Sequence, residues 1–110
     1  MMLAGNGRTE PQKEKRVVTR NEDKSRYEIF VEDKLGGFAE YRERGENVIF
    51  THTEIDDAFA GQGLGSKLAS GAIADVVQRG KTIVPLCPFI AAYLRKHPEH
   101  DAHVRWPEGQ

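Results

Sequence analysis

Cysteine is nearly absent from this sequence, since Cys87 is the only one among 110 residues. A lone cysteine excludes an internal disulfide, so apolar packing has to hold the fold together. The sequence also lacks an apolar run long enough to span a membrane. Its N-terminal residues do not join a basic head to an apolar stretch, which is the pattern of a signal peptide. From these absences we expect a cytoplasmic protein that does not associate with membranes.

A strong excess of charge of either sign is lacking as well. The 16 basic and 17 acidic side chains give a formal net charge of −1. A nearly neutral chain has no field that attracts nucleic acid or an anionic membrane, so we expect neither as a partner. Hydrophobic residues make up 38% of the chain, which suffices for one modest core and a single domain.

The distribution of polar and apolar residues divides the chain into three parts. Residues 1–15 are polar and without periodicity, so we expect a flexible N-terminal arm. Residues 16–103 carry the periodic segments and form the predicted domain. Residues 104–110 form a short tail, in which Val104 and Trp106 are available to pack back onto the domain.

The first half of the predicted domain has the composition of β-strands. Residues 27–31, 38–42 and 48–55 are rich in β-branched and aromatic side chains, and residues 17–20 add a short fourth strand. Glycines at 36–37 and 45 predict the turns between the three longer strands. Strands joined by such short turns pair in antiparallel fashion.

The second half changes to helical spacing. Apolar residues recur every three or four positions from 64 to 79, and Gly80 is a typical helix end. Residues 81–86 predict a buried strand, and residues 89–96 predict a second helix that ends before Pro98. A strand–helix–strand unit makes its two strands parallel, so the sequence predicts an α/β (α+β) domain with a mixed sheet.

Three glycines, Gly61, Gly63 and Gly65, stand between the longest predicted strand and the helix. Glycines let backbone N–H groups approach a ligand closely, and a helix start adds unpaired N–H groups and a positive dipole end. Ser66 and Lys67 contribute a hydroxyl and a charge in the first helical turn. The pattern predicts an anion site suited to a phosphate or pyrophosphate.

Two known phosphate-binding motifs do not fit these glycines, and one structural alternative remains. A P-loop requires Lys-Ser/Thr after its last glycine, but Gly65 is followed by Ser66 and Lys67 in the reverse order. A dinucleotide fingerprint requires Gly-x-Gly-x-x-Gly, whereas the spacing here is Gly-x-Gly-x-Gly. A purely structural turn into the helix remains open, since glycine turns are common.

The segment from Ala60 to Ser66 resembles motif A of the GNAT acyltransferase superfamily, Arg/Gln-x-x-Gly-x-Gly/Ala. The resemblance extends over residues 27–100, and the phrase Pro-Leu-Cys-Pro-Phe at 85–89, with Tyr93, is similar to a branch of very small stand-alone members. It implies a mixed, mostly antiparallel sheet with a β-α-β-α C-terminal half, in a minimal version without the first two helices. Ala60 departs from the leading Arg/Gln of the motif.

The resemblance implies acetyl-CoA, or another acyl-CoA, as cosubstrate and no metal. Backbone amides of the turn would hold the CoA pyrophosphate, and the end of the preceding strand would align the thioester. The residues that we expect to bind CoA are Thr53, Ile55, Gly61, Gln62, Gly63, Leu64, Gly65, Ser66 and Lys67.

Four side chains are candidates for the chemistry. His52 and Glu54 are two apart on a strand, so they share a face, and either could accept the proton of an amine. Tyr93 matches, by resemblance, the tyrosine that protonates the departing thiolate. Cys87 precedes the second helix and could act as a nucleophile or as that acid. Each has a structural alternative: solvated strand residues, a packed aromatic and a small buried side chain.

Other polar groups carry weaker indications. His97, His100 and His103 are spaced three apart, but Pro98 breaks the helix that would align them, so we expect no metal site. Arg42, Arg44, Arg95 and Lys96 could attract the 3′-phosphate of CoA or serve only as solvated charge.

The sequence thus predicts an acyl-CoA-dependent N-acyltransferase that acts on a primary amine, small molecule or peptide, by direct attack. A module that binds CoA without catalysis is the alternative, and an interaction protein with a structural turn is a third. We expect a monomer or a weak homodimer.

Overall fold

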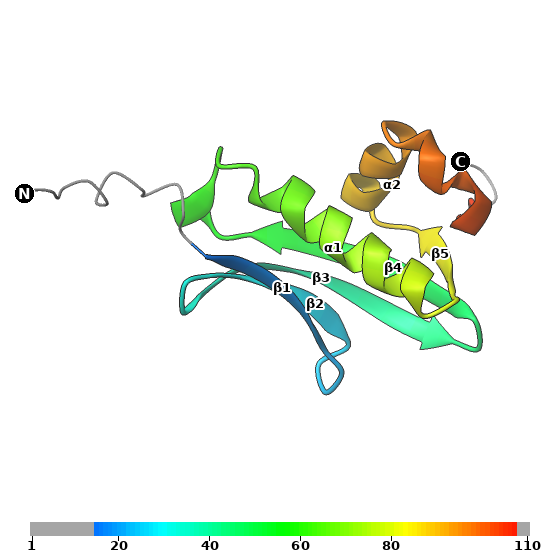
Figure 1. The fold of residues 1–110 in the computed structure, drawn as a ribbon, viewed down its shortest axis with the longest axis horizontal. Helices are drawn as coiled ribbons and strands as arrows, with labels where there is room; N and C mark the ends of the chain where they lie inside the picture. The colour runs from blue at the N-terminus through cyan, green and yellow to red at the C-terminus, as the bar shows by residue number, and fades with distance from the viewer. Residues whose placement is uncertain (1–14, 108–110) are drawn as a thin grey trace, which may run out of the picture.

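The computed structural model describes residues 15–107. The expected N-terminal arm therefore lies almost wholly outside the described residues, as does the end of the expected tail. The described chain forms an alternation of strands and helices, shown in Figure 1: β1 (Arg16–Asn21), β2 (Arg26–Val31), β3 (Lys34–Arg44), β4 (Asn47–Ile55), the 3-10 turn η3 (Asp57–Phe59), α1 (Leu64–Gln78), β5 (Thr82–Pro85), α2 (Pro88–Arg95) and the 3-10 helix η4 (Pro98–His103).

The five strands form one sheet in the order β1-β2-β3-β4-β5. The first four pair in antiparallel fashion, and β5 lies parallel to β4 after the crossover through α1. The mixed, mostly antiparallel sheet predicted from the sequence is confirmed, including the short first strand. Both α1 and α2 lie on one side of it, which we call the inner face (Figure 1).

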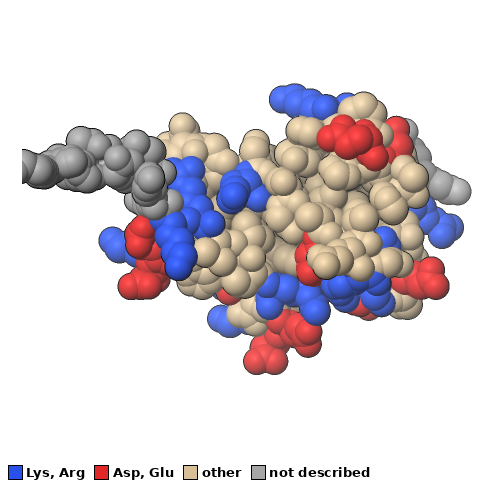
Figure 2. Space-filling model, in the orientation of Figure 1, with Lys and Arg blue, Asp and Glu red and all other residues tan. Residues whose placement is uncertain are grey.

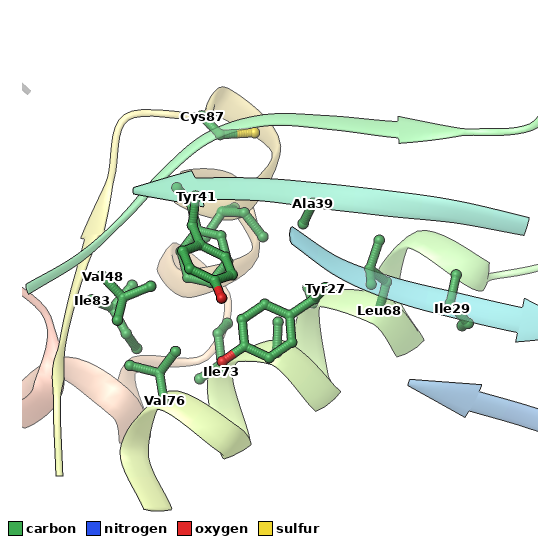
Figure 3. Close-up of a cluster of buried hydrophobic side chains, with 14 of the residues drawn as sticks. Tyr27, Ile29, Ala39, Tyr41, Val48, Leu68, Ile73, Val76, Ile83 and Cys87 are labelled. Carbon is green, nitrogen blue, oxygen red and sulfur yellow. The ribbon is translucent and has the colours of Figure 1, made fainter. Parts of the chain in front are cut away.

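The core lies between the inner face and the helices. Alternate residues of β2 point inward, and Tyr27, Ile29 and Val31 are buried there. Leu68, Ile73 and Val76 on one stripe of α1 are fully buried against them, as expected from their helical spacing (Figure 3). The opposite side of the sheet, the outer face, has no helix over it within residues 15–107.

The turn predicted at Gly36 and Gly37 is wrong, because both glycines lie inside β3. The chain reverses at Glu32, which takes the left-handed conformation with φ of 57°. A Cβ on Gly36 would lie 2.6 Å from Leu64 Cδ2, and one on Gly37 would lie 2.6 Å from the Glu54 carbonyl oxygen. These glycines permit close packing inside the sheet rather than a positive φ.

A β-bulge changes the orientation of β4 halfway along its length. Tyr41 of β3 pairs with Phe50, but the preceding residue, Glu40, pairs with His52, which leaves Thr51 without an opposite residue. Phe50 is buried on the inner face, and after the bulge His52 points to the outer face. The bulge therefore decides which side chains of β4 reach each side of the sheet.

The C-terminal segment packs onto the domain, as its apolar residues indicated. Val104 makes a parallel bridge to Ile83, and the Arg105 N–H donates to the Ile83 carbonyl at 2.8 Å. Trp106 is partly buried against the core. Residues 98–103, at the end of the predicted domain, form η4. Within residues 15–107, no helix is both long and apolar enough to cross a membrane.

Candidate active site

The glycine turn, residues 60–66, enters α1 through two left-handed glycines. Gly61 has φ of 78° and Gly63, the N-cap of α1, has φ of 77°. A Cβ at either position would meet nothing within 4 Å, so glycine is favoured there by backbone conformation and not by lack of space. The helix starts after Gly63, whose carbonyl accepts the first intrahelical bond from the Lys67 N–H at 3.2 Å.

The backbone N–H groups at this helix start have no acceptor within the described chain. No side chain caps α1, and the N–H groups of Gly63, Leu64, Gly65 and Ser66 bond to no other residue in 15–107. Such groups, together with the positive end of the helix dipole, form an anion site. Basic side chains lie beside the start of α1 in Figure 2.

Gly65 has a different role from the other two glycines. It lies within α1, and a Cβ there would approach Phe89 Cζ to 2.6 Å. Phe89 belongs to the first turn of α2 and is 40% exposed. The absent side chain at Gly65 thus allows the starts of the two helices to meet through an aromatic ring. Sequence reasoning missed Phe89, because nothing in the sequence pairs it with the turn.

Gln62 lies in the turn, but its polar groups form hydrogen bonds within the protein. Its N–H donates to the Phe59 carbonyl at 3.3 Å. Its carbonyl and side-chain oxygen accept from Arg16 Nη1 and Nη2 at 3.1 and 3.2 Å. Arg16 thereby ties the edge strand β1 to the turn and brings a positive charge to it. A hollow of about 310 Å³ continues from there between β1 and α1, lined by Arg16, Val17, Val18, Lys67, Ser70 and Gly71.

The ladder between β4 and β5 ends just before the start of α2, whose Phe89 lies against Gly65 of the glycine turn. Its last pair is Phe50 with Pro85, and β4 continues without β5 to Ile55. The Phe50 carbonyl accepts two N–H groups, from Leu86 at 3.0 Å and Cys87 at 2.9 Å. The two strands therefore part here, and on that side no strand within residues 15–107 pairs with the edge of β4 at residues 51–55.

Thr53 and Cys87 meet across the parting strands. Thr53 Oγ1 lies 3.2 Å from Cys87 Sγ, within hydrogen-bonding distance. Cys87 is the N-cap of α2 and is only 3% exposed, at one end of the buried cluster in Figure 3. Its thiol is therefore part of the core in this conformation, in agreement with the structural alternative to its nucleophilic role.

His52 and Glu54 share a face, as their spacing predicted, and form a pair. His52 Nε2 lies 2.8 Å from Glu54 Oε2, and both side chains are more than half exposed. The imidazole lies 6.4 Å from the ring of Phe38, measured between centroids, on the neighbouring strand. The pair projects from the outer face, so it lies on the other side of the sheet from the glycine turn.

Tyr93 lies on α2 and contacts His97, which follows it by four positions. Its ring stacks on His97 with centroids 4.0 Å apart, and His97 Nδ1 lies 2.8 Å from the Tyr93 carbonyl oxygen. The Tyr93 hydroxyl has no hydrogen-bond partner among residues 15–107. In the same part of the chain, no three His, Cys, Asp or Glu side chains converge as metal ligands.

The predicted residues therefore fall into three groups. The glycine turn holds the N–H groups that have no acceptor within residues 15–107, Thr53 and Cys87 line the inner side of the parting strands, and His52 and Glu54 lie on the outer side. Arg42 and Arg44, considered for the 3′-phosphate, project from the outer face and so lie away from the turn. Arg95 instead lies over the ring of Trp106.

Comparison with known proteins identifies the family and the fold. The family model described as GCN5-related N-acetyl-transferase matches residues 26–104. The solution structure of a GCN5-like protein from Staphylococcus aureus, assigned as a candidate N-acetyltransferase, superposes with a TM-score of 0.63 at 20% identity, over 86% of this chain and 92% of that one.

A crystal structure of Ard1 from Thermoplasma volcanium covers 54% of this chain and 41% of its own, at 16% identity and a TM-score of 0.48. No curated protein sequence matches the chain. The staphylococcal structure shares the fold, and the family model covers more than half of the sequence. The chain therefore belongs to the GCN5-related N-acetyltransferase family, whose chemistry is acyl transfer.

Proposed function

We propose that this protein transfers the acyl group of an acyl-CoA, with acetyl-CoA as the donor, to a primary amine. The observation that carries the proposal is the row of N–H groups at Gly63–Ser66 that have no acceptor within residues 15–107, on a turn that lies against α2 just after β4 and β5 part. An anion site and an open strand edge in one place suit a ligand that has both phosphates and amide groups, as CoA does.

Each part of CoA has a matching feature in this arrangement. The pyrophosphate binds the glycine turn, with the charges of Arg16 and Lys67 beside it. The nucleotide end occupies the hollow between β1 and α1. The amide groups of the pantetheine arm hydrogen-bond to the edge of β4 at residues 51–55, much as a further strand would. The thioester then lies near Thr53 and Cys87.

The transfer is a direct attack. The acceptor ammonium gives a proton to His52 or Glu54, directly or through water, and the neutral nitrogen attacks the thioester carbonyl carbon. A C–N bond forms, the C–S bond breaks, and backbone N–H groups near Ile55 stabilise the intermediate oxyanion. As the intermediate collapses, its nitrogen loses a second proton and Tyr93 or Cys87 protonates the departing thiolate. The second proton from nitrogen restores that acid, and the products are an amide and CoA.

Particular residues bear on two alternatives. A covalent route through Cys87 would require the thiol, 3% exposed, to become accessible when the β4 edge is occupied. A CoA-binding module without catalysis is favoured by Ala60, which replaces the Arg/Gln of motif A, and by the exposure of the His52–Glu54 pair. In that module the donor binds at the turn but no acceptor is acetylated.

A titration with acetyl-CoA, monitored by amide NMR, tests the proposal. We expect saturable shifts at residues 61–67 and then release of the CoA thiol when a panel of primary amines is added. Shifts without amine-dependent release above hydrolysis would favour the binding module. The absence of any shift would overturn the proposed function. Full activity in Cys87→Ala would exclude the covalent route, whereas an acetyl adduct on Cys87 in mass spectrometry would support it.

A further inference from the structure

A hollow opens on the outer face of the sheet, beside the end of the β4–β5 ladder. It has a volume of about 300 Å³ and is lined by Arg42, Arg44, Ile49, Thr51 and Leu86. We call it the arginine hollow. Its residues come from β3, from β4 and from the position directly after β5. It is separate from the glycine turn, which lies at the start of α1 on the inner face.

The two arginines of the hollow are available to a ligand. Strand alternation turns Glu43 inward, where it binds Arg79, and turns its neighbours Arg42 and Arg44 outward. Arg20, Arg26 and Arg79 each pair with a carboxylate. In contrast, neither Arg42 nor Arg44 has an ion-pair or hydrogen-bond partner for its guanidinium among residues 15–107.

The arginine hollow lies on the outer side of the same gap whose inner side holds Thr53 and Cys87. Leu86 directly precedes Cys87, and Thr51 is the bulged residue between Phe50 and His52. The hollow thus borders the place where β4 and β5 part, on the face that carries the His52–Glu54 pair. Ile49, at the floor of the hollow, is three positions from His52 on the same strand.

We propose that the arginine hollow binds a carboxylate of the acceptor, so that the acceptors are amines that also carry a carboxylate. A guanidinium donates paired hydrogen bonds in a geometry that fits a carboxylate. Leu86, 53% exposed, and Ile49 offer an apolar surface to the carbon chain between the two charged ends. The amine end then meets His52 and Glu54. This proposal deepens the proposed function and rests on it.

Binding is measured first, independently of turnover, with acetyl-CoA present. The probes are L-glutamate against L-glutamine amide, and the C-terminally amidated peptide Gly-Glu-Glu-Leu-NH2 against Gly-Gln-Gln-Leu-NH2, so that in each pair, matched in size, only one member carries a carboxylate. We expect NMR shifts at Arg42, Ile49, Thr51 and Leu86 with the carboxylate member only. A response to the free amino acid, the peptide or both identifies the source of the carboxylate. Equal shifts with the amide members, stronger shifts with phosphoethanolamine, or none with any probe would overturn the proposal.

Turnover provides the second test. Arg42→Gln/Arg44→Gln should raise the KM for the carboxylate acceptor about tenfold or more and leave acetyl-CoA binding unchanged. Lys24→Gln/Lys34→Gln removes two positive charges that do not line the hollow and should change neither value. Arg42→Glu/Arg44→Glu should shift the preference toward diamines. An unchanged KM in both arginine variants would contradict carboxylate binding in the arginine hollow. Failure of the parent protein to bind acetyl-CoA would contradict only the proposed function.

Discussion

At the scale of single residues, the glycine turn contains two kinds of glycine. Gly61 and Gly63 have positive φ and open space around the missing Cβ, so their role lies in the backbone. Gly65 is helical, and its missing Cβ makes room for Phe89. Because Gly65 allows the two helices to pack together, mutations at Gly65 and at Phe89 should have coupled effects on the free energy of unfolding.

Gly65→Ala should therefore destabilise the protein by about 1–3 kcal/mol through overpacking against Phe89. Phe89→Ala removes the ring that the new methyl group meets, so the double variant should lose less than the sum of the two single variants. Urea denaturation of the four proteins measures this coupling. Strict additivity would show that Gly65 and Phe89 do not interact, and Gly61→Ala serves as a comparison in which only backbone strain changes.

A second residue-scale feature joins the end of α1 to the sheet. Arg79 Nη2 lies 2.8 and 2.7 Å from the two carboxylate oxygens of Glu43, and Lys81 Nζ lies 2.9 Å from one of them. Hydrogen bonds from Arg79, and then from Lys81, lower the pKa of Glu43. Burial, and a 2.6 Å hydrogen bond to Asp75, raise the pKa of Tyr27 in the same cluster.

Because the pKa of Glu43 is lower in the folded protein, its stabilisation is present above the pKa of the unfolded chain and is lost as pH falls through the folded value. Glu43→Gln should cost about 1 kcal/mol near neutral pH. The difference in free energy of unfolding from the parent protein should close as the pH falls below the folded pKa of Glu43, which lies under the ordinary value for glutamate. Urea denaturation across this range measures it, with Glu99→Gln as a control. A gap that persists in acid would assign the loss to packing instead.

At the scale of elements, β4 organises the candidate site. Its first half belongs to the core and pairs with β5, and its second half has an open edge and points His52 and Glu54 outward. The bulge at Thr51 separates the two halves. One strand thus presents the edge that we propose for the donor and, on the outer face, the pair that we propose for the acceptor.

The sequence predicted the type and order of the main elements, because helical spacing at 64–79 and β-branched runs are local signals. It also located the glycine turn. It could not predict the bulge, the contact of Gly65 with Phe89 or the pairing of Thr53 with Cys87, since each depends on residues far apart in the chain. The error at Gly36 and Gly37 has the same origin, because a glycine required by a neighbouring strand looks locally like a turn.

The strand role of Gly37 leads to a prediction at this scale. Gly37→Ala would place a methyl group 2.6 Å from the Glu54 carbonyl, which is backbone and cannot move aside, so we expect a loss of about 2–3 kcal/mol. Gly45→Ala has positive φ but open space and should lose only about 1 kcal/mol. Thermal and urea unfolding compare the two. Equal losses would contradict a steric role for Gly37.

At the scale of the whole molecule, the fold is one-sided. The helices and the glycine turn occupy the inner face, and the outer face holds the His52–Glu54 pair and the arginine hollow. The proposed donor and acceptor sites therefore lie on opposite faces of the sheet. The gap where β4 and β5 part connects the two faces. The glycine turn, β1 and both helix starts would be in contact with a single bound CoA.

Acetyl-CoA should therefore stabilise the whole domain and not the turn alone. A ligand at 100 times its Kd adds about 2.7 kcal/mol to the free energy of unfolding, which for a domain of this size raises Tm by roughly 10 °C or more. Pantetheine lacks the phosphates that the Gly63–Ser66 N–H groups would bind, so at equal concentration it should raise Tm far less. Differential scanning calorimetry measures both ligands. If pantetheine stabilises the protein as well as acetyl-CoA does, the glycine turn is not the anchor of the ligand and only the β4 edge remains to hold it.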